Sequence, residues 1–279
     1  MTFRFNPRLQ AYLPKHALTR FAGLVANARM GGVTTRIIQR FIRRYGVDMS
    51  EAQQPDPAAY PTFNEFFTRA LRPEVRPLAK ARLLCPVDGS VSQFGPIDGD
   101  RIIQAKGHDY SIAALLGETG PLVRHFTGGH FATLYLSPRD YHRIHMPCDG
   151  KLVSMRFVPG DLYSVNPATA AAVPGLFARN ERLVCIFEGA DGPASRFALV
   201  LVGATIVGSM ATVWHGLVAR RGQCNWHYDS RNIELKQGEE MGRFLLGSTV
   251  VLLFPPGRLA FNAQWTPQGT IRMGEMMAD

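Results

Sequence analysis

Two stretches near the N-terminus carry apolar residues at the spacing of an amphipathic helix, in which side chains three and four positions apart share one face. The first stripe consists of Leu9, Leu13, Phe21, Leu24 and Val25. The second consists of Val33, Ile37, Ile38, Phe41, Ile42 and Tyr45. We therefore expect amphipathic helices within residues 1–60.

A different pattern begins near Leu83, where short apolar runs alternate with turns rich in Gly, Pro, Asn and Asp. Residues 50–80 lie between the two patterns and are typical of a proline-rich connector with one short helix around Phe63–Ala70. The sequence thus predicts an α+β fold, with N-terminal amphipathic helices followed by a β-rich, mainly antiparallel body. The runs that best fit buried strands are Phe131–Leu136, Leu183–Phe187, Ala198–Gly203 and Thr249–Phe254.

Charge is concentrated at the helical end of the chain. The formal net charge is +9, and residues 1–47 hold nine Lys and Arg residues without any Asp or Glu. A basic amphipathic helix can lie on an anionic lipid surface, with its arginines at the phosphates. A helix packed on the body with a solvated basic face fits the pattern equally well. Nucleic acid is disfavoured, because the region lacks Lys/Arg/Gly repeats and interleaved stacking aromatics.

Composition narrows the class of protein further. With 279 residues, 46% of them hydrophobic, the chain can bury a large core. The longest largely apolar run, Phe197–Met210, is shorter than the roughly 20 residues that span a bilayer, and the N-terminus lacks the apolar stretch of a signal peptide. The four cysteines are far apart and form no CxxC pair, and because no secretory leader precedes them, we expect reduced thiols in a cytosolic compartment.

Three short segments hold polar residues that a plain strand and turn do not require. They are Pro86–Gly89, Ser137–Pro147 and Leu246–Thr249. Taken alone, Asp88-Gly89 is a common turn dipeptide. Asp88, a histidine and Ser248 could instead assemble a triad, because triads are recognised by geometry and not by order along the chain.

A metal site at His142 and His145 is disfavoured, although Cys148 follows at the same three-residue spacing. Pro147 interrupts any helix there, and no further ligand pair completes a set. We therefore expect no metal.

Together these segments resemble the phosphatidylserine decarboxylases of the bacterial, membrane-associated type. Leu246-Gly247-Ser248-Thr249 is similar to the self-cleavage motif of that family, and the other two segments resemble its two further polar motifs in the same order. The similarity extends over almost the whole chain through the stretches Thr62–Phe67, Gln104–His108, Phe177–Arg182 and Val202–Gly208.

The resemblance implies that the chain cuts itself between Gly247 and Ser248 and converts Ser248 into a covalent pyruvoyl cofactor. In this family, the residue matching His145 is the base that activates the serine, and the residue matching Asp88 orients it. The pyruvoyl group then decarboxylates phosphatidylserine to phosphatidylethanolamine through a Schiff base. His142 is the candidate proton donor for that second reaction.

The same resemblance implies partners and a location. We expect phosphatidylserine and an anionic membrane surface, the two cleavage fragments held together, a homodimer and no nucleic acid. We also expect a peripheral position on the cytoplasmic face of the inner membrane. Residues 1–60 would form the helical membrane-associating region and residues 61–279 the β-rich catalytic domain.

Two alternatives remain open from the residues themselves. An Asp-His-Ser lipid hydrolase would use the same side chains without self-cleavage. A basic lipid-binding module would perform no chemistry, and a cut at Gly247 would then serve no purpose.

Overall fold

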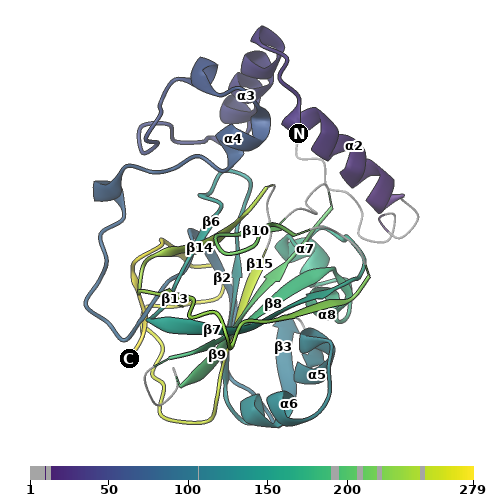
Figure 1. The fold of residues 1–279 in the computed structure, drawn as a ribbon, viewed down its shortest axis with the longest axis vertical. Helices are drawn as coiled ribbons and strands as arrows, with labels where there is room; N and C mark the ends of the chain where they lie inside the picture. The colour runs from purple at the N-terminus through teal and green to yellow at the C-terminus, as the bar shows by residue number, and fades with distance from the viewer. Residues whose placement is uncertain are drawn as a thin grey trace.

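Three helices form one end of the molecule, at the top of Figure 1, and a β-rich body forms the rest. The computed structural model describes residue 10 and residues 14–105, 107–189, 195–205, 210–218, 222–245 and 249–279. The three helices are α2 (Lys15–Asn27), α3 (Gly32–Tyr45) and α4 (Phe63–Phe67). Short 3-10 turns at Pro57–Ala59 and Pro73–Val75 lie in the connector.

Local sequence signals account for the ends of these helices. The Thr62 hydroxyl accepts a hydrogen bond from the Glu65 N–H at 3.1 Å, so Thr62 is the N-cap of α4. Gly46 ends α3 in the left-handed region at φ 68°. Arg43 and Arg44 occupy the last turn of α3, where positive charge interacts favourably with the helix dipole.

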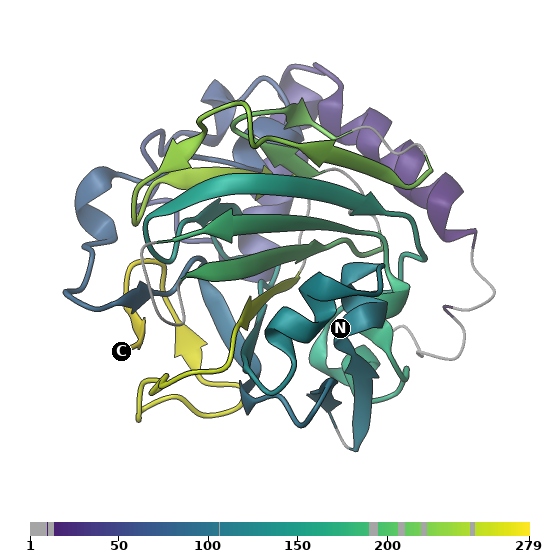
Figure 2. The same ribbon diagram turned by 60° about the horizontal axis from the view of Figure 1, so that its bottom comes forward.

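The body is built on two sheets. Nine of the described strands form the larger sheet, whose order is β12 (Cys224–His227), β7 (Gly150–Val158), β8 (Arg182–Glu188), β9 (Arg196–Val202), β15 (Thr249–Phe254), β5 (His130–Tyr135), β2 (Gly89–Pro96) and β16 (Thr270–Ile271), with β13 (Glu234–Leu235) also on β7. The smaller sheet has the order β11 (Gly216–Leu217), β10 (Met210–Thr212), β14 (Glu240–Phe244) and β6 (Arg143–His145). Figure 2 shows several long strands of the larger sheet side by side.

Two short pairs complete the strands: β1 (Leu83–Leu84) with β17 (Met276–Ala278), and β3 (Arg101–Ala105) with β4 (His108–Ser111). All of these ladders between described strands are antiparallel. The predicted α+β class, with N-terminal helices and a mainly antiparallel body, is therefore confirmed.

Each face of the larger sheet has its own core. One core lies toward the smaller sheet and includes Ile144, Met241 and Phe244. The opposite core is covered by α5 (Ile112–Leu116), α6 (Pro121–Phe126) and α8 (Leu176–Arg179), while α7 (Pro167–Ala170) adds Ala170 to it.

Strand β15 lies between these cores in the middle of the sheet. Val250, Leu252 and Phe254 enter the first core, and Val251 and Leu253 enter the second. A strand buried on both faces needs apolar side chains at successive positions, which explains its uninterrupted hydrophobic run.

A third, smaller core joins the N-terminal helices to the connector. Ile38 of α3 packs with Val47 and with Phe66 and Phe67 of α4. The Phe41 ring lies 5.1 Å from that of Phe63, in an edge-on arrangement. Helix α3 is thus attached to the body through α4.

Candidate active site

Strand order brings two of the polar segments, together with Thr249 of the third, to one edge of the larger sheet. Tyr135, the last residue of β5, pairs with Ser90 of β2 on one side and with Thr249 of β15 on the other. Asp88 lies two residues before Ser90, and the Ser137–Pro147 segment continues from the end of β5. The predicted cleavage site immediately precedes Thr249 in the sequence, but Leu246, Gly247 and Ser248 lie outside the described residues.

Gly89 is required by the closeness of β2 to β5. A Cβ atom on Gly89 would lie 2.2 Å from the backbone oxygen of Tyr135, a separation that no side chain tolerates. The Asp88-Gly89 dipeptide therefore begins a strand at a close backbone approach, beyond the turn role that it commonly has.

The smaller sheet adds the histidine segment to this edge. The His145 N–H donates to the Pro86 oxygen at 2.8 Å, and the Phe244 N–H donates to the His142 oxygen at 3.0 Å. The end of β14, just before the cleavage motif, is therefore bonded to the histidine segment. Backbone pairing thus brings the first two segments to one edge, beside Phe244 and Thr249, which lie on either side of the predicted cleavage site.

The Asp88 carboxylate is buried and forms an ion pair with Arg76. Arg76 donates to it from Nε at 3.0 Å and from Nη2 at 2.6 Å, and the Met273 N–H donates at 2.8 Å. The same guanidinium donates to Glu51 at 2.6 Å and 3.1 Å. This arrangement satisfies the buried charge of Asp88, which would otherwise be costly.

The His145 ring has two hydrogen-bond partners, and Asp88 is neither of them in the described structure. Its Nδ1 lies 2.8 Å from the Gly238 oxygen, and its Nε2 lies 3.0 Å from the Tyr141 hydroxyl. Burial lowers the pKa of His145, and the hydrogen bond to Gly238 and the charges of Glu240 and Asp88 oppose that shift.

His142 is fully buried on the other side of the same segment. Its Nδ1 lies 2.8 Å from the Asp140 oxygen, while its Nε2 has no hydrogen-bond partner among the described residues. The Phe67 ring of α4 packs against it with ring centroids 4.1 Å apart. Burial lowers the pKa of His142 to about 3, so the ring is neutral at physiological pH.

A mixed-charge cavity of about 220 Å³ opens beside Asp88 and Tyr141. Arg69 and Arg139 line it, together with Asp140. Arg69 is buried, which lowers its pKa, and its Nε has no hydrogen-bond partner in the described part of the chain. The described residues contain no cluster of three or more His, Cys, Asp or Glu side chains able to hold a metal ion.

Sequence reasoning assigned no role to Arg76, Glu51, Tyr141 or Gly238. A buried aspartate requires a cation, but nothing in the sequence selects Arg76 among the 31 Lys and Arg residues. Tyr141 belongs to the histidine motif, yet only the fold brings its hydroxyl to His145. Gly238 contributes its backbone carbonyl, and because every residue has one, the sequence gives no sign of this role.

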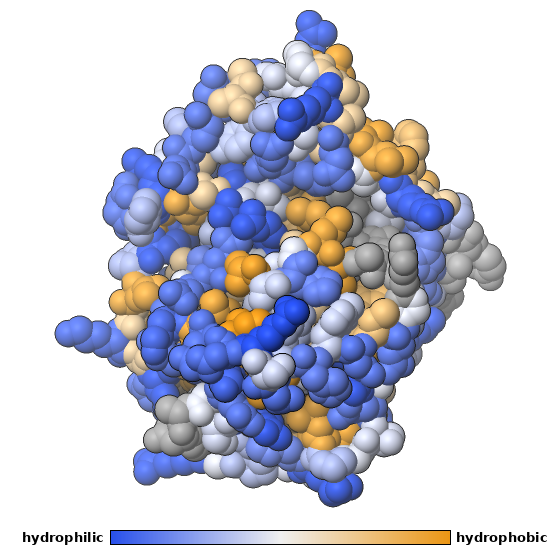
Figure 3. Space-filling model, viewed as in Figure 1, coloured by the Kyte–Doolittle hydropathy of each residue, from blue (hydrophilic) through white to orange (hydrophobic). Residues whose placement is uncertain are grey.

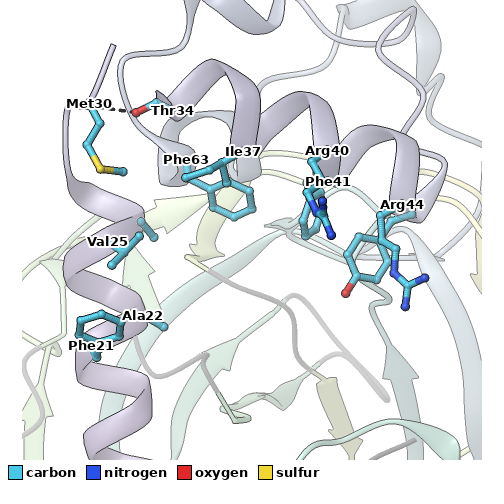
Figure 4. Close-up of a pocket in the computed structure, with 12 residues that line it drawn as sticks. Phe21, Ala22, Val25, Met30, Thr34, Ile37, Arg40, Phe41, Arg44 and Phe63 are labelled. Atoms are coloured by element: carbon cyan, nitrogen blue, oxygen red, sulfur yellow. Dashed lines mark hydrogen bonds between the residues drawn. The ribbon is translucent and has the colours of Figure 1, made fainter. Parts of the chain in front are cut away.

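A second candidate site lies between α2 and α3, where an apolar groove of about 490 Å³ opens to solvent (Figure 4). Phe21 and Val25 lie on one side, Ile37 and Phe41 lie on the other, and Arg40 is at the rim. Phe21 is 68% exposed and Leu24 is 73% exposed. Figure 3 shows apolar side chains gathered along the upper right of the molecule, where Figure 1 places α2. No helix in the described part of the chain is long and apolar enough to cross a membrane.

Comparison with known proteins finds similarity both in the helical N-terminal region and in the β-rich body. A family model described as phosphatidylserine decarboxylase matches residues 63–279, and a second, described as PSD, matches residues 8–46. A protein of Variovorax paradoxus is 65% identical over 273 residues, which cover 97% of this chain and 95% of the relative. A protein of Methylibium petroleiphilum is 63% identical over 281 residues, covering 100% of this chain and 98% of the relative. Both relatives carry the name phosphatidylserine decarboxylase proenzyme.

Proposed function

Because this chain belongs to the phosphatidylserine decarboxylase family, we propose that it converts phosphatidylserine to phosphatidylethanolamine with a pyruvoyl group made from its own Ser248. Family membership confirms the resemblance found in the motifs and makes the chain a decarboxylase. The observation that carries the mechanism is the convergence of Asp88, the histidine segment and the start of β15 at one edge of the sheet.

Maturation begins when the Ser248 hydroxyl attacks the carbonyl carbon of Gly247. The serine Oγ–C bond forms and the peptide C–N bond breaks, so the amide becomes an ester with a free amine. Removal of the Ser248 α-proton expels the ester carboxylate. The resulting dehydroalanine tautomerises and hydrolyses to the pyruvoyl group and ammonia. The word proenzyme in the relatives' names supports such a processing step.

His145 is the proposed base for the attack. Its Nδ1 faces a carbonyl oxygen, which can only accept, so this nitrogen carries the proton and Nε2 carries the lone pair that can accept one. Burial lowers the pKa of the ring, which favours the neutral form that a base requires. Asp88 lies within electrostatic range of His145 and favours the imidazolium that forms.

The pyruvoyl group, once formed, supplies the electron sink for the charge left when carbon dioxide departs. The buried Nε2 of His142, without a partner among the described residues, fits a site that has to receive a substrate. Its Nδ1 donates to the Asp140 carbonyl, so Nε2 starts as a proton acceptor. We infer that His142 takes up the proton that the substrate nitrogen loses after it has bonded to the carbonyl carbon, and then returns a proton to the carbon that has lost carbon dioxide.

The substrate reaches this site from a membrane. The groove between α2 and α3 offers apolar surface for acyl chains, and Arg40 and Arg44, which also line it, can bind lipid phosphates. The mixed-charge cavity beside Asp88 suits a headgroup that carries both signs. We place the protein peripherally on the cytoplasmic face of the inner membrane, with residues 1–60 as the lipid-binding region.

A homodimer also belongs to this proposal, as the family resemblance implies. Native mass spectrometry of the mature protein in detergent tests it directly. A mass of two copies of each fragment would support the dimer, and a mass of one copy of each would contradict it.

Intact mass under denaturing conditions tests self-cleavage. The wild-type protein should give one chain of residues 1–247 and a second of residues 248–279 that begins with a pyruvoyl group. Ser248→Ala should give one uncut chain without decarboxylase activity. Ser154→Ala, on the distant strand β7, is the matched control and should be cut normally. An uncut wild-type chain would favour the hydrolase alternative, and a cut Ser248→Ala chain would refute serine-dependent cleavage.

A further inference from the structure

The His145 ring is clamped between a backbone carbonyl and a phenol. Its Nδ1 lies 2.8 Å from the Gly238 oxygen on one side, and its Nε2 lies 3.0 Å from the Tyr141 hydroxyl on the other. The two rings are tilted by 34° with their centroids 5.6 Å apart. Both side chains come from the same short segment, whose residues Arg143–His145 form strand β6.

The direction of both hydrogen bonds follows from the carbonyl. Because the Gly238 oxygen can only accept, Nδ1 must carry the ring proton, and the neutral ring then has its lone pair on Nε2. The Tyr141 hydroxyl therefore donates to Nε2. These two bonds together select one tautomer and one orientation of the ring.

Tyr141 is suited to remain a donor over a wide pH range. Its side chain is buried, and this burial raises the pKa of its hydroxyl far above physiological pH. The side chain also lines the cavity that contains Asp88, so the phenol stands between the cavity and the histidine.

We propose that Tyr141 is a positioning residue for self-cleavage: its hydroxyl holds the His145 ring in place through Nε2 until the Ser248 hydroxyl replaces it at that nitrogen. This inference rests on the proposed role of His145 as the base. It assigns to the tyrosine the orientation of the ring that a triad aspartate provides elsewhere. Asp88, held by Arg76, then acts on His145 through its charge alone in this state.

The proposal predicts both a rate and a pH effect. A hydrogen bond donated to Nε2 stabilises the neutral ring, so its loss should raise the pKa of His145. Cleavage requires the unprotonated base, and its rate therefore rises with pH through that pKa. Tyr141→Phe should slow cleavage on the order of tenfold at neutral pH. It should also move the midpoint of the acid limb upward by roughly 0.5 to 1 pH unit.

Cleavage of freshly translated full-length chain, followed over time at a series of pH values, measures both effects. The matched control is Tyr228→Phe, since Tyr228 is another buried tyrosine whose hydroxyl lies 3.3 Å from a histidine nitrogen, that of His215. We expect wild-type kinetics from the control. Unchanged kinetics in Tyr141→Phe, or slower cleavage with an unshifted midpoint, would overturn the positioning role.

Nitrogen NMR of the histidines in a Ser248→Ala background provides a readout that does not depend on cleavage. Nδ1 of His145 should stay protonated in both proteins, because it faces the Gly238 oxygen. The nitrogen shift of Nε2 should be that of a hydrogen-bonded acceptor when Tyr141 is present and that of an unbonded nitrogen in Tyr141→Phe. An Nε2 shift that is the same in both proteins would contradict the proposal. Failure of the proposed function is distinguishable, because cleavage would then persist in Ser248→Ala or His145→Ala.

Discussion

Two histidines three residues apart have different surroundings, and this separates the reactions that each can serve. Nε2 of His145 is bonded to Tyr141, whereas Nε2 of His142 has no partner among the described residues and lies against Phe67. His142→Ala should therefore mature normally but lose turnover by a factor on the order of 10² to 10⁴. The paired measurement is the fraction cleaved and the phosphatidylethanolamine formed per pyruvoyl group. Full turnover by His142→Ala would exclude His142 as the proton carrier. Failure of His142→Ala to cleave would show that His142 also takes part in self-cleavage.

Asp88 is expected to serve maturation by its charge. Asp88→Asn removes the negative charge that favours imidazolium at His145, so cleavage should slow strongly, and His145→Ala should block it more fully. The same change leaves Arg76 paired with Glu51 alone, so thermal unfolding should be measured alongside the cleavage rate. Normal cleavage in both variants would show that another group activates Ser248.

The buried His142 also makes stability depend on pH. Its pKa is about 3 in the folded protein and roughly 6.5 in an unfolded chain, so between these values the unfolded chain binds the extra proton. Stability should therefore fall as pH drops from about 6.5, by about 1.4 kcal/mol per pH unit for one proton. Urea unfolding of Ser248→Ala measures this slope, and adding His142→Asn should reduce it. An identical slope in both proteins would contradict a neutral, buried His142.

At the scale of elements, the exposed apolar side chains of α2 offer a sharp test of membrane attachment. Replacing Phe21 and Leu24 with Glu should weaken binding to anionic vesicles at least tenfold, because each buried side chain contributes about 1.5–3 kcal/mol. Ile103→Glu is the control, since Ile103 is 52% exposed on β3, at the other end of the molecule (Figure 1). Equal binding by all three proteins would exclude α2 as the contact.

Measuring vesicle binding at increasing salt concentration should separate its electrostatic contribution from its apolar contribution. Screening weakens the attraction of the basic N-terminal region for anionic lipid, whereas insertion of apolar side chains leaves a residual attachment. Deleting residues 1–47 is a coarser test, because Ile38 packs on Phe66 and Phe67. A folded deletion variant with unchanged vesicle binding would nevertheless refute the assignment.

Periodicity predicted these elements well where one pattern dominates. The predicted strand Thr249–Phe254 coincides with β15, and the second helical stripe lies within α3. The helix expected around Phe63–Ala70 ends earlier, at Phe67. Leu9 and Leu13 of the first stripe lie outside the described residues.

The partners within the site could not be read from the sequence in the same way. Asp88, His142 and His145 were identifiable because their motifs are local, but Arg76 and Gly238 reach the site only through tertiary structure. Gly238 is 93 residues from His145, and its carbonyl depends on the turn before β14. The sequence therefore indicated candidate side chains for the chemistry, and the fold determines which groups contact them.

At the scale of the whole molecule, self-cleavage would not separate the two chains. The fragment that begins at Ser248 contains β15, which pairs with β5 and β9, and β16 and β17, which pair with β2 and β1. The fragments should therefore elute together from a sizing column and part only in denaturant. Separation under native conditions would contradict this arrangement.

Because β15 lies in the middle of the sheet, a cut before it would also change whether the protein can unfold and refold reversibly. An uncut chain refolds in a single-molecule reaction, so its recovery from urea should not depend on concentration. After such a cut, the sheet can re-form only when the two separate fragments associate. Until they do, the fragment of residues 248–279 exposes the almost wholly apolar sequence of β15. Aggregation competes with that encounter. We therefore expect little folded protein to be recovered after mature protein is unfolded in urea and the urea is removed. Ser248→Ala protein should refold under the same conditions.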